Sequence, residues 1–247
     1  MAIHDSETER SSGPDPDRET LTGSSGDESK TASTDPAFSE DRALALLARR
    51  DLPPDILEKL SKNPAALKSR KVKLGIVGHP RTPRYVALSL LRGLFSFDLM
   101  QVSLSPAIHG DIKVAADEAL LNRMESISVG EKLSLARRAS GRVAGALLIG
   151  PDPRVFRAAL DNSRMTEALL LQALMSSAAT TAFVRHVCEH DKWSLRREVQ
   201  MALLRNCKTP LEYAIAFARA LPAVLVRELL QGAPLSDEVK AAILREL

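Results

Sequence analysis

The chain has 247 residues, of which 45% are hydrophobic but only 4% aromatic, and it carries two cysteines. A composition rich in Leu and Ala favours packed helices and argues against a β-sandwich, in which aromatic and β-branched residues are enriched. Two cysteines exclude a disulfide framework or a Cys-x-x-Cys zinc pair. The absence of a signal-peptide pattern and of an apolar run of about 18–20 residues predicts a cytoplasmic protein with no membrane partner.

The net charge of +3 hides a strong asymmetry along the chain. Residues 1–42 contain eleven acids and four bases, a net charge of −7, and the remainder therefore carries +10. Residues 1–40 consist mainly of Ser, Thr, Gly, Asp, Glu and Pro, which cannot bury enough apolar surface to offset the entropy of ordering. The sequence therefore predicts a disordered acidic tail over 1–40 and a folded, basic domain over 41–247.

From Ser39 onward the apolar residues recur with the period of 3.6 that is typical of amphipathic helices. Proline and glycine positions divide this region into short segments. The predicted helices cover residues 41–50, 54–61, 64–77, 84–95, 98–104, 110–123, 129–140, 142–149, 152–161, 167–176, 178–190, 193–205, 211–221, 223–231 and 236–246.

A Thr or Ser recurs directly before an apolar helix, at Thr82, Ser128, Thr166 and Thr209. The gaps of 46, 38 and 43 residues indicate a repeat of about 42. Two of these sites predict helix-capping boxes, with Glu residues three positions further on. Because one such unit cannot bury its apolar stripe alone, stacking of neighbours is expected. The predicted fold class is therefore all-α, an α-solenoid of about five three-helix repeats.

The Thr or Ser before each apolar helix, together with His79 or Asn206 a few residues upstream, resembles the pattern of bacterial HEAT-like, armadillo-like and leucine-rich-repeat-variant solenoids. The resemblance covers residues 41–247. It implies a scaffold that binds partners on its concave face, and it transfers no catalytic or cofactor residue to this chain.

An alternative for residues 73–80 is a buried strand that enters a nucleotide-binding loop. A P-loop would require Gly-Lys-Ser/Thr, whereas the chain has Pro83-Arg84-Tyr85. The sequence therefore favours a third helix of the first unit here, although Gly75 weakens such a helix by about 1 kcal/mol relative to Ala.

The segment His186-Val187-Cys188-Glu189-His190 matches the His-x-x-Glu-His pattern of some zinc proteases. On a helix, His186 and His190 would share one face, as zinc coordination needs. No motif in the remaining residues supplies a third ligand, so a zinc-dependent hydrolase is the most distant hypothesis. We predict no catalytic residue and no cofactor, and we keep these histidines only as weak metal candidates.

Basic residues recur in several of the predicted units and could form one stripe along a stacked array. Such a stripe would suit contacts with a nucleic-acid backbone, although solvated helix faces explain the same pattern. The acidic tail could also fold back onto it. The candidate binding residues are Lys71, Lys73, Arg84, Arg138, Arg142, Arg157 and Arg197.

The sequence favours a non-enzymatic protein–protein interaction scaffold, with another protein as partner. The alternative is a basic solenoid that binds the backbone of duplex nucleic acid. Cys188 and Cys207 are expected to be buried or half-buried thiols. Trp193 is expected to open a helix and to anchor the fourth unit against the fifth.

Overall fold

The computed structural model describes residues 39–247, so the predicted tail lies almost entirely outside the described residues. Within 39–247 all regular secondary structure is helical, which confirms the all-α class. The helices are α2 (Glu40–Leu47), α3 (Pro54–Lys62), α4 (Pro64–Lys68), α5 (Arg70–Gly78), α6 (Arg84–Leu91), α7 (Ser96–Leu104), α8 (Gly110–Leu121), α9 (Val129–Arg138), α10 (Gly141–Leu147), α11 (Pro153–Leu160), α12 (Glu167–Leu174), α13 (Thr181–Glu189), α14 (Arg197–Leu204), α15 (Leu211–Ala220), α16 (Ala223–Gln231) and α17 (Asp237–Leu244).

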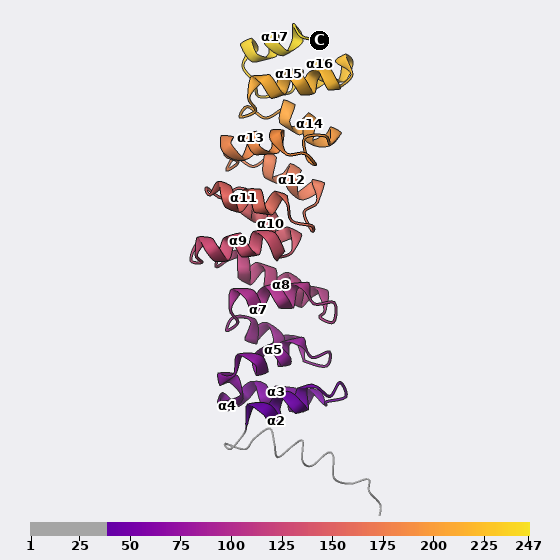
Figure 1. Cartoon of the computed structure of the whole chain (residues 1–247). Coiled ribbons are helices and arrows are strands. Elements are labelled where there is room, and N and C mark those ends of the chain that lie inside the picture. Colours follow the sequence, from indigo (N-terminus) through magenta and orange to yellow (C-terminus); the bar gives the residue numbers. More distant parts are fainter. Residues whose placement is uncertain (1–38) are drawn as a thin grey trace, which may run out of the picture.

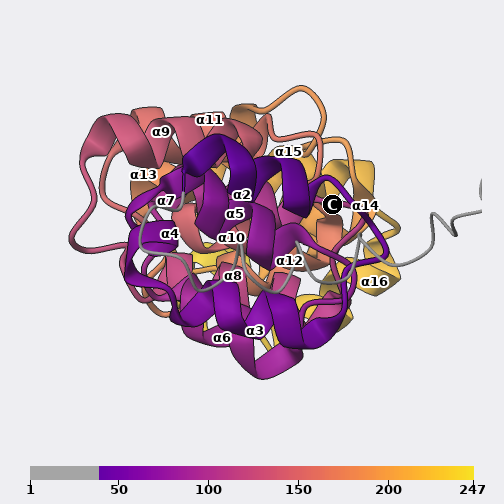
Figure 2. The same cartoon turned by 90° about the horizontal axis from the view of Figure 1, so that it is seen from below.

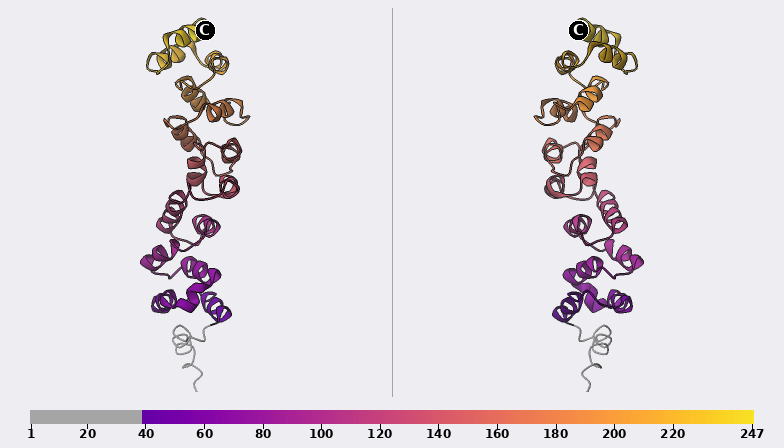
Figure 3. Two further views of the ribbon diagram at one scale, coloured as in Figure 1. Left: turned by 90° about the vertical axis from the view of Figure 1, so that its left-hand side faces the viewer. Right: turned by 90° about the vertical axis from the view of Figure 1, so that its right-hand side faces the viewer.

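The helices form two parallel rows, and the chain alternates between them (Figures 2 and 3). Row A contains α2, α5, α7, α9, α11, α13, α15 and α17. Row B contains α3, α6, α8, α10, α12, α14 and α16, each in contact with the next. The short α4 packs against α3 and α5. The main contacts join helices that are at most three apart in chain order. The molecule is therefore long, and the helices follow one another along its axis (Figure 1).

One continuous hydrophobic core runs between the two rows, from Ala43 of α2 to Ile243 of α17. Helix α11 shows how the sequence builds it: Val155, Phe156, Ala159 and Leu160 recur at helical spacing and are all buried. The ring of Phe156 meets that of Phe183 in α13 edge to face at 5.9 Å. Burial of each such ring contributes about 2–3 kcal/mol.

Polar side chains at four helix ends fasten a helix to its neighbour in the same row. The imidazole of His79, after α5, donates through Nε2 to the carbonyl of Arg49, after α2, at 2.8 Å. Asn162, after α11, donates to the carbonyl of Ala136 in α9 at 2.8 Å. These side chains satisfy carbonyls that the last turn of a helix leaves without partners.

The same arrangement occurs twice in row B. Asn206, after α14, donates to the carbonyl of Leu174 in α12 at 2.8 Å. Arg123, after α8, donates to the carbonyls of Leu94 and Arg92 just beyond α6. We call these four side chains, His79, Arg123, Asn162 and Asn206, the row clamps. Each one joins the end of the third predicted helix of a unit to the end of the first.

The predicted caps are only partly confirmed. Ser128 and Thr166 cap α9 and α12 as expected, and Glu131 completes the capping box of α9. Thr82 and Thr209 do not cap a helix: Pro83 and Pro210 occupy the N-cap positions. The two threonine hydroxyls instead donate backwards to the carbonyls six residues earlier, of Ile76 at 2.5 Å and Leu203 at 2.7 Å.

The predicted helix 64–77 is wrong in one respect, because it is two helices. The backbone of Ser69 is extended, and its hydroxyl accepts from the amide of Val72 to begin α5. The strand alternative for residues 73–80 is excluded, since α5 continues to Gly78. A Cβ on Gly75 would lie 2.9 Å from a methyl group of Leu47, so the glycine lets α2 and α5 approach closely.

Trp193 also differs from its prediction. It lies in a turn before α14 rather than opening a helix. Its side chain is buried and donates to the carbonyl of Leu160 at the end of α11, at 3.0 Å. Trp193 therefore anchors the turn before α14 to the end of α11, in the predicted third unit, whereas an anchor between the fourth and fifth units was expected. At the other end, Ile243 and Val239 of α17 pack into the core, whereas Leu247 is exposed.

Candidate protein-binding groove

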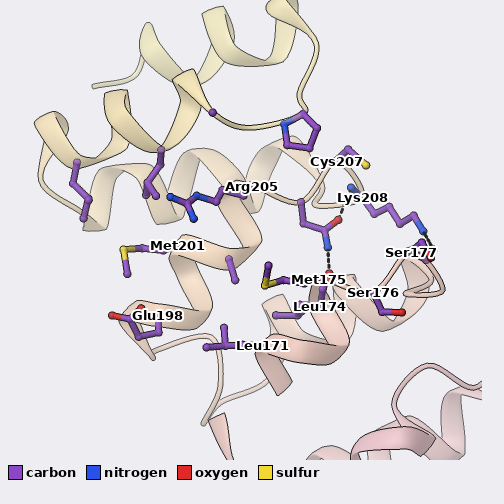
Figure 4. A pocket seen from close by; sticks show the side chains of 16 residues that line it. Leu171, Leu174, Met175, Ser176, Ser177, Glu198, Met201, Arg205, Cys207 and Lys208 are labelled. Atoms are coloured by element: carbon purple, nitrogen blue, oxygen red, sulfur yellow. Dashed lines mark hydrogen bonds between the residues drawn. The ribbon is translucent and has the colours of Figure 1, made fainter. Parts of the chain in front are cut away.

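A hollow of about 640 Å³ lies on row B, between α12, α14 and α16 (Figure 4). We call it the row B groove. Its lining is mostly aliphatic, with polar side chains on the rim. The lining residues are Leu171, Leu174, Met175, Ser176, Ser177, Glu198, Met201, Ala202, Arg205, Asn206, Cys207, Lys208, Leu225, Leu229, Gly232 and Pro234.

Apolar side chains inside the groove are unusually accessible. Met175, just after α12, is 82% exposed, while Met201 of α14 and Leu225 of α16 are half-buried. Methionine is flexible and polarisable, which suits a surface that must adapt to an apolar partner. The helix periodicity alone does not distinguish these residues from core residues, because it does not show whether neighbouring helices cover them.

The row clamp Asn206 fixes one end of this groove. Its amide donates to Leu174 of α12, and its carbonyl oxygen accepts from the amide of Lys208 at 2.9 Å (Figure 4). The ammonium of Lys208 then donates to the carbonyls of Ser177 and Ala179. The connection between α12 and α13 is therefore held rigidly beside α14, and the groove is formed without any partner.

Two opposite charges border the apolar lining. Glu198, in the first turn of α14, and Arg205, just after its last turn, are both exposed. Neither forms a salt bridge with another residue in 39–247, whereas many other exposed charges do. Arg205 is therefore available to a carboxylate of a partner, and Glu198 to a basic group.

A second, smaller hollow of about 330 Å³ adjoins the row B groove across α12. It lies between α8, α10 and α12 and includes Leu121, Ile149 and Leu169. Ser176 lines both hollows. Row B therefore presents an accessible, largely aliphatic surface over five successive helices.

The two cysteines lie in contrasting environments. Cys188 of α13 is buried, and desolvation raises the pKa of its thiol to about 12. Cys207 is exposed on the rim of the row B groove, so the prediction that both thiols are covered is wrong for Cys207.

The two candidate metal ligands, His186 and His190, have different partners in the structure. His186, within α13, lies against the guanidinium of Arg157 and edge to face on Phe156. His190, the residue after α13, faces Asp161 at 3.3 Å. No three His, Cys, Asp or Glu side chains within residues 39–247 lie close enough together to hold a metal ion.

The seven candidate basic residues are divided between the two rows. Lys71, Lys73, Arg138 and Arg157 belong to row A helices, and Arg84, Arg142 and Arg197 belong to row B helices. In row B, Arg84 and Arg142 pair with the carboxylates of Asp111 and Glu118. The structure therefore does not bring the seven together in one row.

Among helices α5 to α12, the excess of basic residues lies in row A. Helices α5, α7, α9 and α11 contain eight Lys and Arg residues and two acids. The facing row B helices α6, α8, α10 and α12 contain three bases and four acids. The two rows thus present different chemistry, aliphatic on row B and basic on row A.

No family model matches the chain, and neither a curated protein nor a solved structure matches it. None of the helices in residues 39–247 is both long enough and apolar enough to cross a membrane.

Proposed function

We propose that this protein is a protein-binding scaffold whose stacked helices form an α-solenoid of five three-helix repeats. The row clamps support the repeats, because the same contact joins the third helix of a unit to the first in each of four units. In the fifth unit, an ion pair between Arg219 and Glu246 joins α15 to the C-terminal residues after α17. A cytoplasmic setting fits the two free cysteines.

The partner that this proposal assigns to the row B groove is an amphipathic helix. A groove between neighbouring helices of one row can receive apolar side chains at positions i, i+3, i+4 and i+7 of such a helix. The exposed methionine at position 175 is the observation that carries the proposal, because a side chain 82% exposed in an aliphatic hollow gains most from a partner. Acidic residues beside the apolar stripe of the partner would pair with Arg205.

A direct test uses a fluorescein-labelled helical peptide of about 16 residues with a Leu stripe and flanking Glu residues, measured by fluorescence polarisation. A control peptide has the same composition in scrambled order. The protein should bind the amphipathic peptide and not the scrambled one. Replacing one Leu of the stripe by Ala should weaken binding by about 1–3 kcal/mol, or roughly 5- to 150-fold.

Matched variants locate the binding site. Met175→Asp places a charge inside the groove and should abolish binding. Leu195→Asp makes the same kind of change at a side chain that is 78% exposed but lies outside the groove, and should leave binding unchanged. Equal binding of the scrambled peptide, or equal effects of the two variants, would contradict the proposal.

A further inference from the structure

Three arginines on row A surround a hollow that contains little negative charge. Arg137 of α9 and Arg154 and Arg157 of α11 line a space of about 450 Å³ between these two helices. Asp161 also lines this space, and its carboxylate faces His190. On the other side of α9, Arg138 lines a neighbouring hollow of about 580 Å³. We call Arg137, Arg138, Arg154 and Arg157 the basic face.

The charges of the basic face are only partly compensated within the described residues. Arg154 pairs with Asp152 at 2.8 Å, and its hydrogen bond lowers the pKa of that carboxyl group. Arg157 meets the imidazole of His186, which supplies no negative charge. Arg137 and Arg138 form no salt bridge with any residue in 39–247. Guanidinium groups in such a cluster favour carboxylates, which they bind through paired hydrogen bonds.

The N-terminal segment of the same chain carries carboxylates in a matching pattern. Acids alternate with other residues in Asp5-x-Glu7-x-Glu9 and again in Asp15-x-Asp17-x-Glu19. In an extended chain, residues i and i+2 lie on one face, about 6.6–7 Å apart. Each triplet can therefore present three carboxylates to one row of arginines.

The length of the segment is suited to this surface. Residue 39 begins the described chain directly before α2, and row A leads from α2 through α5 and α7 to α9 and α11. Helix spacings of 8–10 Å put the basic face roughly 25–40 Å from α2. Glu19 precedes Ser39 by 20 residues and Asp5 precedes it by 34. Random-coil chains of these lengths have root-mean-square spans of roughly 25–32 Å. These spans are close to the distance between α2 and the basic face. The effective concentration of the acidic segment at the basic face is highest when the two lengths match.

We propose that residues 5–19 dock in extended form on the basic face of row A, with the acidic triplets paired to Arg137, Arg154 and Arg157. This inference is independent of the row B groove, because the two surfaces lie on opposite rows. The docked segment covers these arginines and so excludes other polyanions from them.

The test uses the full-length chain with a nitroxide attached to the S11C/C207S variant, and measures paramagnetic broadening of backbone amide signals. The buried Cys188 remains unlabelled in the native state. Amide signals of α9 and α11 should broaden at low ionic strength and recover at high salt, because exposed charge pairs are screened. Signals of α10 and α14 in row B should remain sharp.

Two sets of changes remove the interaction from either side. Replacing the first triplet, as D5N/E7Q/E9Q, should reduce the broadening, whereas D27N/E28Q/D35N removes the same number of carboxylates close to α2 and should leave it unchanged. R137E/R154E/R157E should abolish the broadening, and the row B control K113E/R197E/R227E should not. Because the tail changes leave residues 39–247 unaltered, they stay informative even if the arginine variant fails to fold.

Several outcomes would overturn the inference. Broadening that is absent, that falls on row B, or that survives D5N/E7Q/E9Q together with D15N/D17N/E19Q would show that the acidic triplets do not occupy the basic face. Salt-sensitive binding of duplex DNA to α9 and α11 without any such broadening would assign the face to nucleic acid instead.

Discussion

Asn122 and Asn162 both follow a helix end, but Asn122 is the C-cap residue of α8, whereas Asn162 lies one residue beyond the C-cap of α11, and only Asn162 is a row clamp. Asn162 is 2% exposed, donates to the carbonyls of Ala136 and Ala139, and accepts from the amide of Arg164. Asn122 is exposed, and Arg123 makes the clamp in that unit. Asn162→Ala should lower the free energy of unfolding by about 1–3 kcal/mol, because it leaves buried polar groups unpaired.

Urea denaturation followed by circular dichroism measures this difference, and Asn122→Ala is the matched control. That control should change the stability by less than about 0.5 kcal/mol, as for other exposed positions. Equal destabilisation by the two variants would mean that the hydrogen bonds of Asn162 do not stabilise the stack.

The two cysteines should differ strongly in reactivity. A thiol reacts as the thiolate, and the raised pKa of Cys188, about 12, leaves almost none of it charged near pH 8. Iodoacetamide at pH 8 should therefore alkylate Cys207 in the native protein and both cysteines in denaturant, as measured by mass spectrometry. Rapid native alkylation of Cys188 would show that α13 is not packed as described.

The raised pKa of Cys188 also fixes a direction for the dependence of stability on pH. The folded state holds the thiol proton more tightly than the unfolded state does. The contribution of the protonated Cys188 thiol to the free energy of unfolding is therefore fully present below pH 9. It is lost progressively as the pH rises from about 9 towards 12.

At the scale of single helices, the approach of α10 to the turn before α12 depends on Gly141. A Cβ at this position would collide with the backbone carbonyl of Arg164 and lie 3.1 Å from a methyl group of Leu169. Gly141→Ala should therefore destabilise the protein by about 1–3 kcal/mol, the usual cost of overpacking. Gly110→Ala, in the first turn of α8, meets no atom within 4 Å and should be neutral or stabilising by up to about 1 kcal/mol. Thermal denaturation of the two variants measures this difference in stability.

The element boundaries were largely predictable because apolar periodicity and proline positions act locally. Helix α16, for example, begins and ends at the predicted residues, 223 and 231. The functions of Thr82 and Thr209 were not predictable in the same way. A threonine before a proline can cap the next helix or bond back to the previous one, and the choice depends on the angle between helices, which local pattern does not contain.

The row B groove was beyond sequence reasoning for a related reason. Met175 and Met201 satisfy the helical period and so resemble core residues. Only the spacing of α12, α14 and α16 leaves them accessible. Likewise, the candidate basic stripe combined residues from both rows. Consecutive helices lie in alternate rows, and the sequence pattern indicates which side of a helix is polar but not in which row the helix lies.

At the scale of the whole molecule, stability should be local if contacts run only between neighbouring helices. Ile243→Ala removes a fully buried side chain of α17. Amide hydrogen exchange should then accelerate in α15–α17 and remain unchanged in α5–α9. Leu247→Ala, at an exposed position, is the control and should alter neither region. Uniform acceleration along the whole chain would instead indicate a single cooperative core.

The strict alternation of helices between two rows has a consequence for how such a chain can lengthen. In the proposed three-helix units, the first helices of successive units are separated by an odd number of row changes. These first helices, α6, α9, α12 and α15, therefore lie in row B and row A by turns. Duplicating or deleting one unit would transfer every later helix to the other side and exchange the aliphatic and basic surfaces beyond that point. Only even numbers of units, about 84 residues at a time, can be gained or removed while both surfaces keep their sides.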